Sequence, residues 1–353
     1  MDFPIIPYDT MPFDGSAVAT AMNPWPSLLK KAFYLDCGNG EKIFYYDSPP
    51  QVNVPDNGAK CDARPDNGAK CDSPKVCGLS SSAGSMGSAV KEPAAPPVFI
   101  LIHGLGDEAD SWRHLIPLLN ERGFRVLAVD LPGFGRSIAK EKINLKTHAK
   151  AVLKLLEAID PKARVFLAGS SMGSIVAESV AFQKPELVSG LVLINGSIPG
   201  GPLNPGPLIV AKLLLSRKWY KAYRGKPEKA WRSLLPYYAD LNNMPAEDRN
   251  FLQERVMARV ESDTQEKSFF ATQRSIIWTY LFSPSAYARK VRTYKGKILL
   301  VWGKKDKILP LSSAENFKAL RSDIRLEFIS DAGHLPHQER PAETGKLMAE
   351  FAG

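Results

Sequence analysis

The sequence lacks the features that mark disulfide-stapled and membrane-spanning proteins. Its only cysteines are Cys37, Cys61, Cys71 and Cys77, so a disulfide framework is excluded for most of the 353 residues. No apolar run reaches the roughly 18 residues of a membrane span. The first residues, MDFPIIPYDTMPFDG, lack the basic and apolar stretches of a secretory signal. We therefore expect a cytoplasmic protein.

The charge balance is basic, with a formal net charge of +9. Such an excess can attract nucleic acid, anionic lipid or acidic substrates. No nucleic-acid-binding motif is present, so we expect no nucleic-acid partner. Eight Lys and Arg residues fall within 212–232, where Glu228 is the one acid. This stretch is either a solvated helix face or a weak contact with an anionic membrane surface.

The chain divides by composition into four parts. We predict an N-terminal extension (1–30), a first core part (31–196), a helical insertion (197–290) and a second core part (291–353). Within the first core part, 51–91 is rich in Pro, Gly, Ser and Ala, and it cannot bury much apolar surface.

The segment 51–91 carries a short tandem repeat, PDNGAKCD, at 55–62 and again at 65–72. We interpret it as an expanded loop. Its cysteines match no CxxC pair and have no histidine nearby, so we expect no metal.

Strand-like and helix-like segments alternate from residue 97 onward. VFILIHG, FRVLAVDLPG, RVFLAG, VSGLVLING, KILLVWG and RLEFIS read as buried strands, with helical spacing between them. The pattern predicts an α/β fold whose mostly parallel sheet has helices on both faces. The alternation is lost in 197–290, where a helical insertion rich in aromatics is expected to cover the sheet edge as a cap.

The stretch GSSMG, 169–173, lies between a predicted strand and a predicted helix. This is the G-x-S-x-G pattern of a nucleophile elbow, in the context that the elbow needs. The two glycines let strand and helix approach closely, and Ser171 is raised above the sheet edge. We predict Ser171 as a nucleophile.

A serine nucleophile needs a histidine base and a carboxylate that orients it. Only His334 and His337 follow Ser171 in the sequence, and His334 comes just after a strand. We predict His334 as the base and Asp306, after KILLVWG, as the acid. The alternative acid, Asp331, shares its loop with His334.

The segment HGLG, 103–106, follows the first buried strand. We expect the Leu105 and Met172 N–H groups to form an oxyanion hole, and His103 to hold the loop. Trp112, Phe134 and Ser170 are predicted to bind substrate.

These segments are similar, in order and spacing, to the α/β-hydrolase superfamily, and they resemble its esterase-like members with a helical cap. The likeness covers HGLGDEADSW, VDLPGFGRS, GSSMGS, VWGKKDKILP and AGHLPHQERP. The resemblance implies that Ser171, His334 and Asp306 act as nucleophile, base and acid, and it implies no cofactor. The extension 1–30 and the insertion 51–91 depart from the family pattern.

Serine at the elbow argues against the dehalogenases and epoxide hydrolases of this family, which use aspartate there. We therefore expect a serine hydrolase acting on a small ester or a lipid-like substrate with an apolar acyl or aryl group. Two alternatives stay open: a carbon–carbon bond hydrolase of the same fold, and a ligand-binding protein that turns over slowly.

Overall fold

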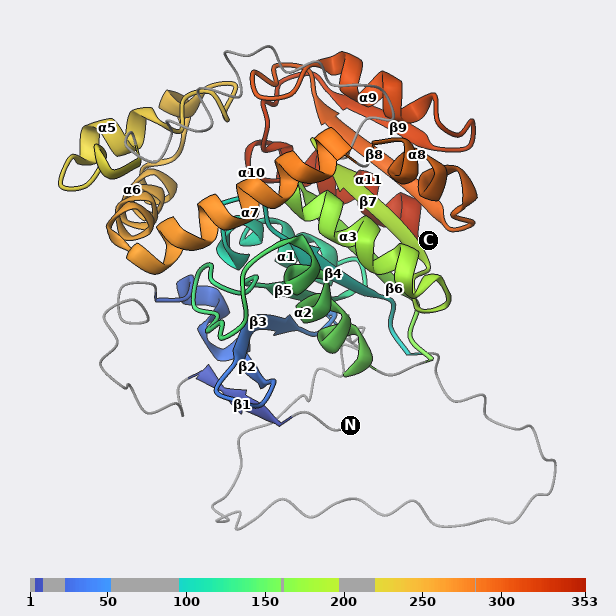
Figure 1. Ribbon diagram of the computed structural model, residues 1–353, viewed down its shortest axis with the longest axis horizontal. Helices are drawn as coiled ribbons and strands as arrows, with labels where there is room; N and C mark the ends of the chain where they lie inside the picture. Colours follow the sequence, from blue (N-terminus) through green and yellow to red (C-terminus); the bar gives the residue numbers. More distant parts are fainter. Residues whose placement is uncertain (1–3, 9–22, 52–94, 160–161, 197–219, 283) are drawn as a thin grey trace, which may run out of the picture. The chain divides into compact units, whose positions relative to one another are not determined.

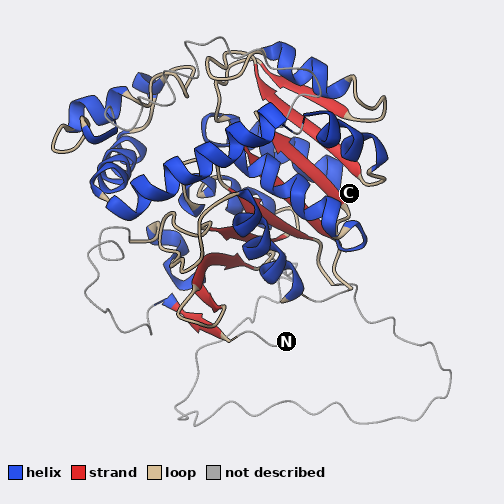
Figure 2. Cartoon of the chain, viewed as in Figure 1, coloured by secondary structure: helices blue, strands red, loops and turns tan. Residues whose placement is uncertain are grey.

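The computed structural model describes residues 4–8, 23–51, 95–159, 162–196, 220–282 and 284–353. Within these ranges a single sheet has nine strands in the order β1-β2-β3-β5-β4-β6-β7-β8-β9. Figure 2 shows this sheet with helices on both of its sides. The predicted insertion 51–91 lies, apart from Gln51, outside the described residues.

The sheet is mostly parallel, as predicted. Strands β4 to β9 run parallel to one another, whereas the pairs β1–β2, β2–β3 and β3–β5 are antiparallel. The strands are β1 (Ile5–Pro7), β2 (Ala32–Asp36), β3 (Lys42–Ser48), β4 (Val98–Ile102), β5 (Arg125–Val129), β6 (Val165–Ser170), β7 (Gly190–Ile194), β8 (Lys297–Gly303) and β9 (Arg325–Ile329).

The continuous apolar run of β4 arises because both faces of the sheet are covered. Its five residues are all buried. Ile100 belongs to one hydrophobic cluster and its neighbours Phe99 and Leu101 belong to the other. Successive side chains of a strand point to opposite faces, so one strand supplies both cores.

Helices cover the two faces of the sheet in separate groups. The first cluster includes buried side chains of α2 (Leu145–Glu157), α3 (Met172–Gln183) and α9 (Leu311–Lys318). The second includes side chains of α1 (Leu115–Asn120) and α11 (Pro341–Ala352). The shorter helices are η2 (Pro26–Lys31), η3 (Ala109–Trp112), η4 (Pro185–Leu187) and α10 (Pro336–Glu339).

Helix α2 shows how the sequence determines where a helix begins and which of its sides is buried. Asn144 precedes it, and the Asn144 side chain accepts hydrogen bonds from the Lys146 and Thr147 N–H groups. This is a capping box, which satisfies backbone donors that a helix start leaves open. Leu145, Ala149 and Val152 are buried on one side of the helix, at helical spacing.

The N-terminal segment adds a strand that the sequence did not predict. Ile5–Pro7 pairs with β2 and places β1 at the edge of the sheet. Farther along, the Trp25 N–H donates to the Asp110 Oδ1, 3.0 Å away, and the Trp25 ring packs edge-on against Phe251. The described parts of the extension therefore pack on the body of the protein.

In the described part of the segment between β7 and β8, where the sequence predicts the cap, there are four α-helices (Figure 1). They are α5 (Pro227–Arg232), α6 (Ala246–Glu261), α7 (Asp263–Phe282) and α8 (Pro284–Thr293), with the short η5 (Leu241–Asn243) before α6. Residues 197–219, which include part of the basic stretch, lie outside the described ranges. Among the helices that the structure describes, none is long and apolar enough to cross a membrane.

Candidate active site

Ser171 occupies the turn between β6 and α3 in a strained backbone conformation. Its φ is +52° and its ψ is −116°, a region that residues with a side chain seldom adopt. The surrounding structure holds it there. The Ser171 N–H donates to the Ile194 carbonyl at 2.8 Å, and the Ser171 carbonyl accepts from the Ser174 N–H at 3.0 Å.

The two glycines of the elbow are required by close backbone approach, as predicted. A Cβ on Gly169 would lie 2.2 Å from the carbonyl carbon of Gly173. A Cβ on Gly173 would lie 2.1 Å from the Ile102 carbonyl oxygen. Each distance is shorter than any real van der Waals contact, so strand β6, helix α3 and strand β4 meet only with glycine at both positions.

The predicted nucleophile, base and acid come together in one chain of hydrogen bonds. His334 Nε2 lies 3.0 Å from Ser171 Oγ, and His334 Nδ1 lies 2.9 Å from Asp306 Oδ2. Asp306 follows β8, and His334 follows β9, so both reach the same sheet edge as Ser171. His334 is 1% exposed, so these hydrogen bonds are shielded from water. The arrangement can raise the nucleophilicity of a serine hydroxyl.

The carboxylate of Asp306 is fixed by more donors than the histidine alone. Asp306 Oδ1 accepts from the backbone N–H groups of Ile308 and Leu309, at 2.7 and 3.0 Å. Asp306 Oδ2 accepts from Asn195 Nδ2 at 2.6 Å. Burial acts to raise the pKa of Asp306, but the hydrogen bonds and the His334 charge outweigh it and hold the pKa below its ordinary value.

The sequence analysis did not identify two residues that lie beside Ser171 and Asp306, namely Asn195 and Gly196. Asn195 Oδ1 also accepts from the Gly303 N–H at 3.0 Å, so its amide joins the ends of β7 and β8. A Cβ on Gly196 would lie 2.2 Å from the Ser171 carbonyl oxygen. The signal was present as the Asn-Gly pair directly after a buried strand, at the edge where Ser171 lies.

The loop after β4 lies against the serine. A Cβ on Gly104 would be 3.5 Å from the Ser171 Cβ. His103 holds this loop: its Nε2 accepts from the Leu131 N–H at 2.9 Å, so its Nδ1 carries the proton and donates to the Gly104 carbonyl at 2.7 Å. Met172 is the first residue of α3, and its N–H is among those a helix start leaves without an intrahelical acceptor.

A cavity of about 420 Å³ opens onto Ser171 and His334. Its lining is mainly apolar, with aliphatic side chains beside six aromatic ones. The aromatic residues are Tyr220, Tyr223, Tyr237, Tyr238, Phe269 and Phe270. Apart from His334, the ionisable acids and bases in the described lining are Asp107 and Arg259, and these two are paired at 2.8 Å. The cavity therefore suits an uncharged, apolar group.

Residues before α6 contact the base directly. The Tyr237 carbonyl accepts from the backbone N–H of His334 at 2.7 Å, and the two rings lie 5.8 Å apart. Two other aromatic residues of the cap do not line the cavity. Trp231 packs in a cluster with Tyr238 and Leu252, and Trp278 is 61% exposed. Trp219 and the Tyr280 side chain are not among the parts of the chain that the structure describes.

The structure corrects the prediction that Trp112, Phe134 and Ser170 bind substrate. All three are fully buried, and none lines the cavity. The rings of Trp112 and His337 lie 4.2 Å apart and are tilted to each other, and Phe134 packs edge-on against His103 at 5.7 Å. These positions follow motifs closely in sequence, but their side chains point into the core.

The alternative acid and base lie elsewhere. Asp331 is exposed and pairs with Lys305 at 2.8 Å. His337 lies in α10 and is buried against Trp112. The described part of the basic stretch is partly neutralised, since Arg224 pairs with Asp263 and Glu266 of α7, each at 2.8 Å.

Comparison with known proteins finds relatives that match this chain over most of their own length. It is 28% identical to the uncharacterized hydrolase YugF of Bacillus subtilis, over 71% of this chain and 88% of that one. It is also 28% identical to a 2-hydroxy-6-oxo-6-phenylhexa-2,4-dienoate hydrolase of Comamonas testosteroni, over 71% of this chain and 86% of that one. An esterase structure from Exiguobacterium antarcticum superposes with a TM-score of 0.64 at 17% identity, covering 90% and 98%.

The family comparison matches more than half of the chain. Residues 97–341, from the start of β4 to the start of α11, match the alpha/beta hydrolase fold family. That span holds both the elbow and the loops that carry Asp306 and His334. The chain belongs to the alpha/beta hydrolase fold family.

Proposed function

We propose that the protein is a serine hydrolase that cleaves an uncharged carboxylic ester with an apolar acyl or aryl group. The observation that carries this proposal is the position of His334, whose two ring nitrogens contact Ser171 Oγ and Asp306 Oδ2 at 3.0 and 2.9 Å. The apolar, aromatic cavity beside the serine supports the apolar half of the substrate.

The reaction has two halves. Ser171 Oγ attacks the ester carbonyl carbon while His334 Nε2 takes the hydroxyl proton, and Asp306 stabilises the resulting imidazolium. The Leu105 and Met172 N–H groups donate to the oxyanion. The bond to the alcohol oxygen then breaks, and His334 returns the proton to the leaving alcohol. Water, deprotonated by His334, attacks the acyl-enzyme, releasing the acid and restoring Ser171.

Carbon–carbon bond hydrolysis is the second candidate, because the Comamonas relative is named for a dienoate substrate. A dienoate carries a carboxylate, which needs a cationic partner. Within the described cavity lining Arg259 is the one Lys or Arg side chain, and it already contacts Asp107 and Glu108 at 2.8 and 3.0 Å. This electrostatic balance favours the ester.

A fluorophosphonate probe with peptide mapping tests the proposal on the wild type and on Ser171→Ala. We expect the label on Ser171, and loss of label and of p-nitrophenyl ester turnover in the variant. A wild type that neither labels nor turns over any ester would contradict the proposal and bring a ligand-binding role forward. Turnover of a dienoate with no ester turnover would favour the second candidate.

A further inference from the structure

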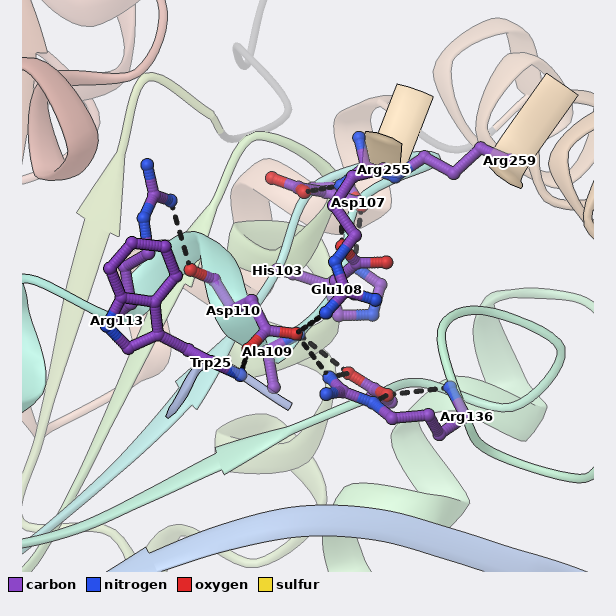
Figure 3. A network of polar contacts seen from close by, with 12 residues as sticks. Trp25, His103, Asp107, Glu108, Ala109, Asp110, Arg113, Arg136, Arg255 and Arg259 are labelled. Atoms are coloured by element: carbon purple, nitrogen blue, oxygen red, sulfur yellow. Dashed lines mark hydrogen bonds and ion pairs between the residues drawn. The ribbon is translucent and has the colours of Figure 1, made fainter. Parts of the chain in front are cut away.

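A buried ionic cluster joins helix α6 to the loop that carries Leu105 (Figure 3). Three of its acids come from the segment after β4, one of them in η3, and the fourth directly follows β5. Its guanidinium groups come from α6 and from the segment after β5. The members of this cluster are Asp107, Glu108, Asp110, Asp130, Arg136, Arg255 and Arg259. Four carboxylates therefore meet three guanidinium groups.

Helix α6 supplies two of these cations from one face. Arg255 and Arg259 are four residues apart, so their side chains lie on the same side of the helix. Arg259 Nη2 lies 2.8 Å from Asp107 Oδ1 and 3.0 Å from Glu108 Oε1. Arg255 lies 3.5 Å from both Glu108 and Asp110. Figure 3 shows both arginine side chains reaching from the helix toward these acids.

Asp107 closes the turn that contains Leu105. The Asp107 N–H donates to the Gly104 carbonyl at 3.2 Å, with Leu105 and Gly106 between them. Each carboxylate oxygen of Asp107 is then held from outside the turn: Oδ1 by Arg259 and Oδ2 by Gln338 Nε2, at 2.8 and 3.3 Å. The direction of the Leu105 N–H is therefore tied to the position of α6.

The charge balance of this turn depends on Arg259. Burial raises the pKa of Asp107, and Arg259 acts against that rise. Burial also acts to raise the pKa of Glu108, but Arg259, Arg255 and Arg136 together lower it to about 2. Without Arg259, two neighbouring carboxylates would be left buried with less counter-charge, and the turn that they flank would rearrange or take up a proton.

We propose that Arg259 is a positioning residue, which acts through Asp107 to hold the Gly104–Asp107 turn so that the Leu105 N–H faces the oxyanion. It follows that the oxyanion hole is complete only while α6 is docked on this loop. The inference rests on the proposed function, because it concerns the same serine site. It makes docking of the cap a condition for the chemical step.

Steady-state kinetics with p-nitrophenyl butyrate on Arg259→Met test this role. Loss of one oxyanion donor costs roughly 100-fold in kcat in a well-ordered site, so a displaced donor is expected to cost about 10-fold to 100-fold. KM should change less than about 3-fold, because the interaction is realised in the transition state. Arg259→Lys should recover part of kcat, since it restores the positive charge that faces Asp107 and Glu108 without the planar guanidinium.

Arg224→Met is the matched control, because Arg224 pairs at 2.8 Å with Asp263 and Glu266 inside the cap and contacts no residue of the turn. It should keep kcat within about 2-fold. A double-mutant cycle of Arg259→Met with Asp107→Asn should lose much less than the product of the single losses, because one residue acts through the other. Circular dichroism and thermal denaturation establish that each variant is folded, and Arg259→Lys supplies the test if Arg259→Met does not fold.

Three results would overturn the proposal. They are a kcat of wild-type size in folded Arg259→Met, an equal loss in Arg224→Met, and a rise in KM with kcat unchanged, which would make Arg259 a substrate contact. Fluorophosphonate labelling of the wild type distinguishes a wrong role for Arg259 from a wrong proposed function. A labelled, active wild type beside an unimpaired Arg259→Met leaves the hydrolase proposal standing, whereas an unlabelled, inactive wild type removes both.

Discussion

The amide of Asn195 donates to Asp306 Oδ2 at 2.6 Å, and this is the same oxygen that His334 contacts. One carboxylate oxygen therefore serves both a fixed amide and the proposed base. The Asn195 amide orients the acid, while the acid orients the histidine. The residue lies outside every segment on which the family resemblance rests.

Asn195→Ala is expected to lower kcat/KM for p-nitrophenyl butyrate by roughly 10-fold to 100-fold, because a hydrogen bond to a charged group contributes about 1.5–3 kcal/mol. The loss should fall mainly on kcat, since no substrate contact is removed. The exposed Asn242 gives the matched control Asn242→Ala, which should behave as wild type. Equal activity of the two variants would mean that His334 and the backbone N–H groups are sufficient to orient Asp306.

Ser171→Gly should be inactive and yet more stable than Ser171→Ala. Glycine adopts positive φ without the penalty that a side chain incurs, so the strain at φ +52° is relieved. We expect a gain of about 1 kcal/mol in the free energy of unfolding over Ser171→Ala. Chemical denaturation of the two variants measures it. A Ser171→Gly protein no more stable than Ser171→Ala would argue that the elbow stores no strain.

Gly173→Ala should destabilise the fold by about 3 kcal/mol or more, because its Cβ would lie 2.1 Å from the Ile102 carbonyl oxygen and backbone must move. Gly225→Ala is the comparison. Gly225 has φ +65° and no atom within 4 Å of the added Cβ, so only backbone strain of about 1 kcal/mol is expected. Thermal denaturation of both variants checks the order, and a Gly173→Ala protein as stable as Gly225→Ala would contradict the close approach.

Stability should fall on acidification partly through His337. Burial, and then the charges of His334 and Arg113, lower its pKa to about 3. The unfolded chain takes up a proton below the ordinary pKa of about 6.5 while the folded protein does not, so the free energy of unfolding falls as pH drops from about 6.5 to 3. The slope from this residue is about 1.4 kcal/mol per pH unit.

His337→Phe removes that contribution while keeping a ring on Trp112, which lies 4.2 Å away. Urea denaturation at pH 7, 6 and 5 should give a shallower decline for the variant than for the wild type. Parallel declines would show that His337 takes up its proton equally well in the folded protein.

The sequence carried enough information for the fold and for the three residues brought together at the sheet edge. Continuous apolar runs, alternating with helical spacing, come from strands buried on both faces, and this depends on local composition. The glycines around Ser171 encode a close approach that no other residue permits. Asp306 and His334 could be predicted because parallel strands bring the residues that follow them to one edge.

The sequence by itself determined the family and the position of the elbow, whereas only the tertiary structure decided what surrounds Ser171. Trp112, Phe134 and Ser170 lie near the motifs along the chain, but all three side chains are buried in the core. The cavity is instead lined by residues such as Tyr220, Phe269 and Gln338, which follow Ser171 in the sequence by about 50 to 170 positions. Asn195 and Arg259 meet their partners across similarly long separations, 111 and 152 residues. Spacing along a chain cannot specify such contacts, because they depend on how separately formed elements pack against each other.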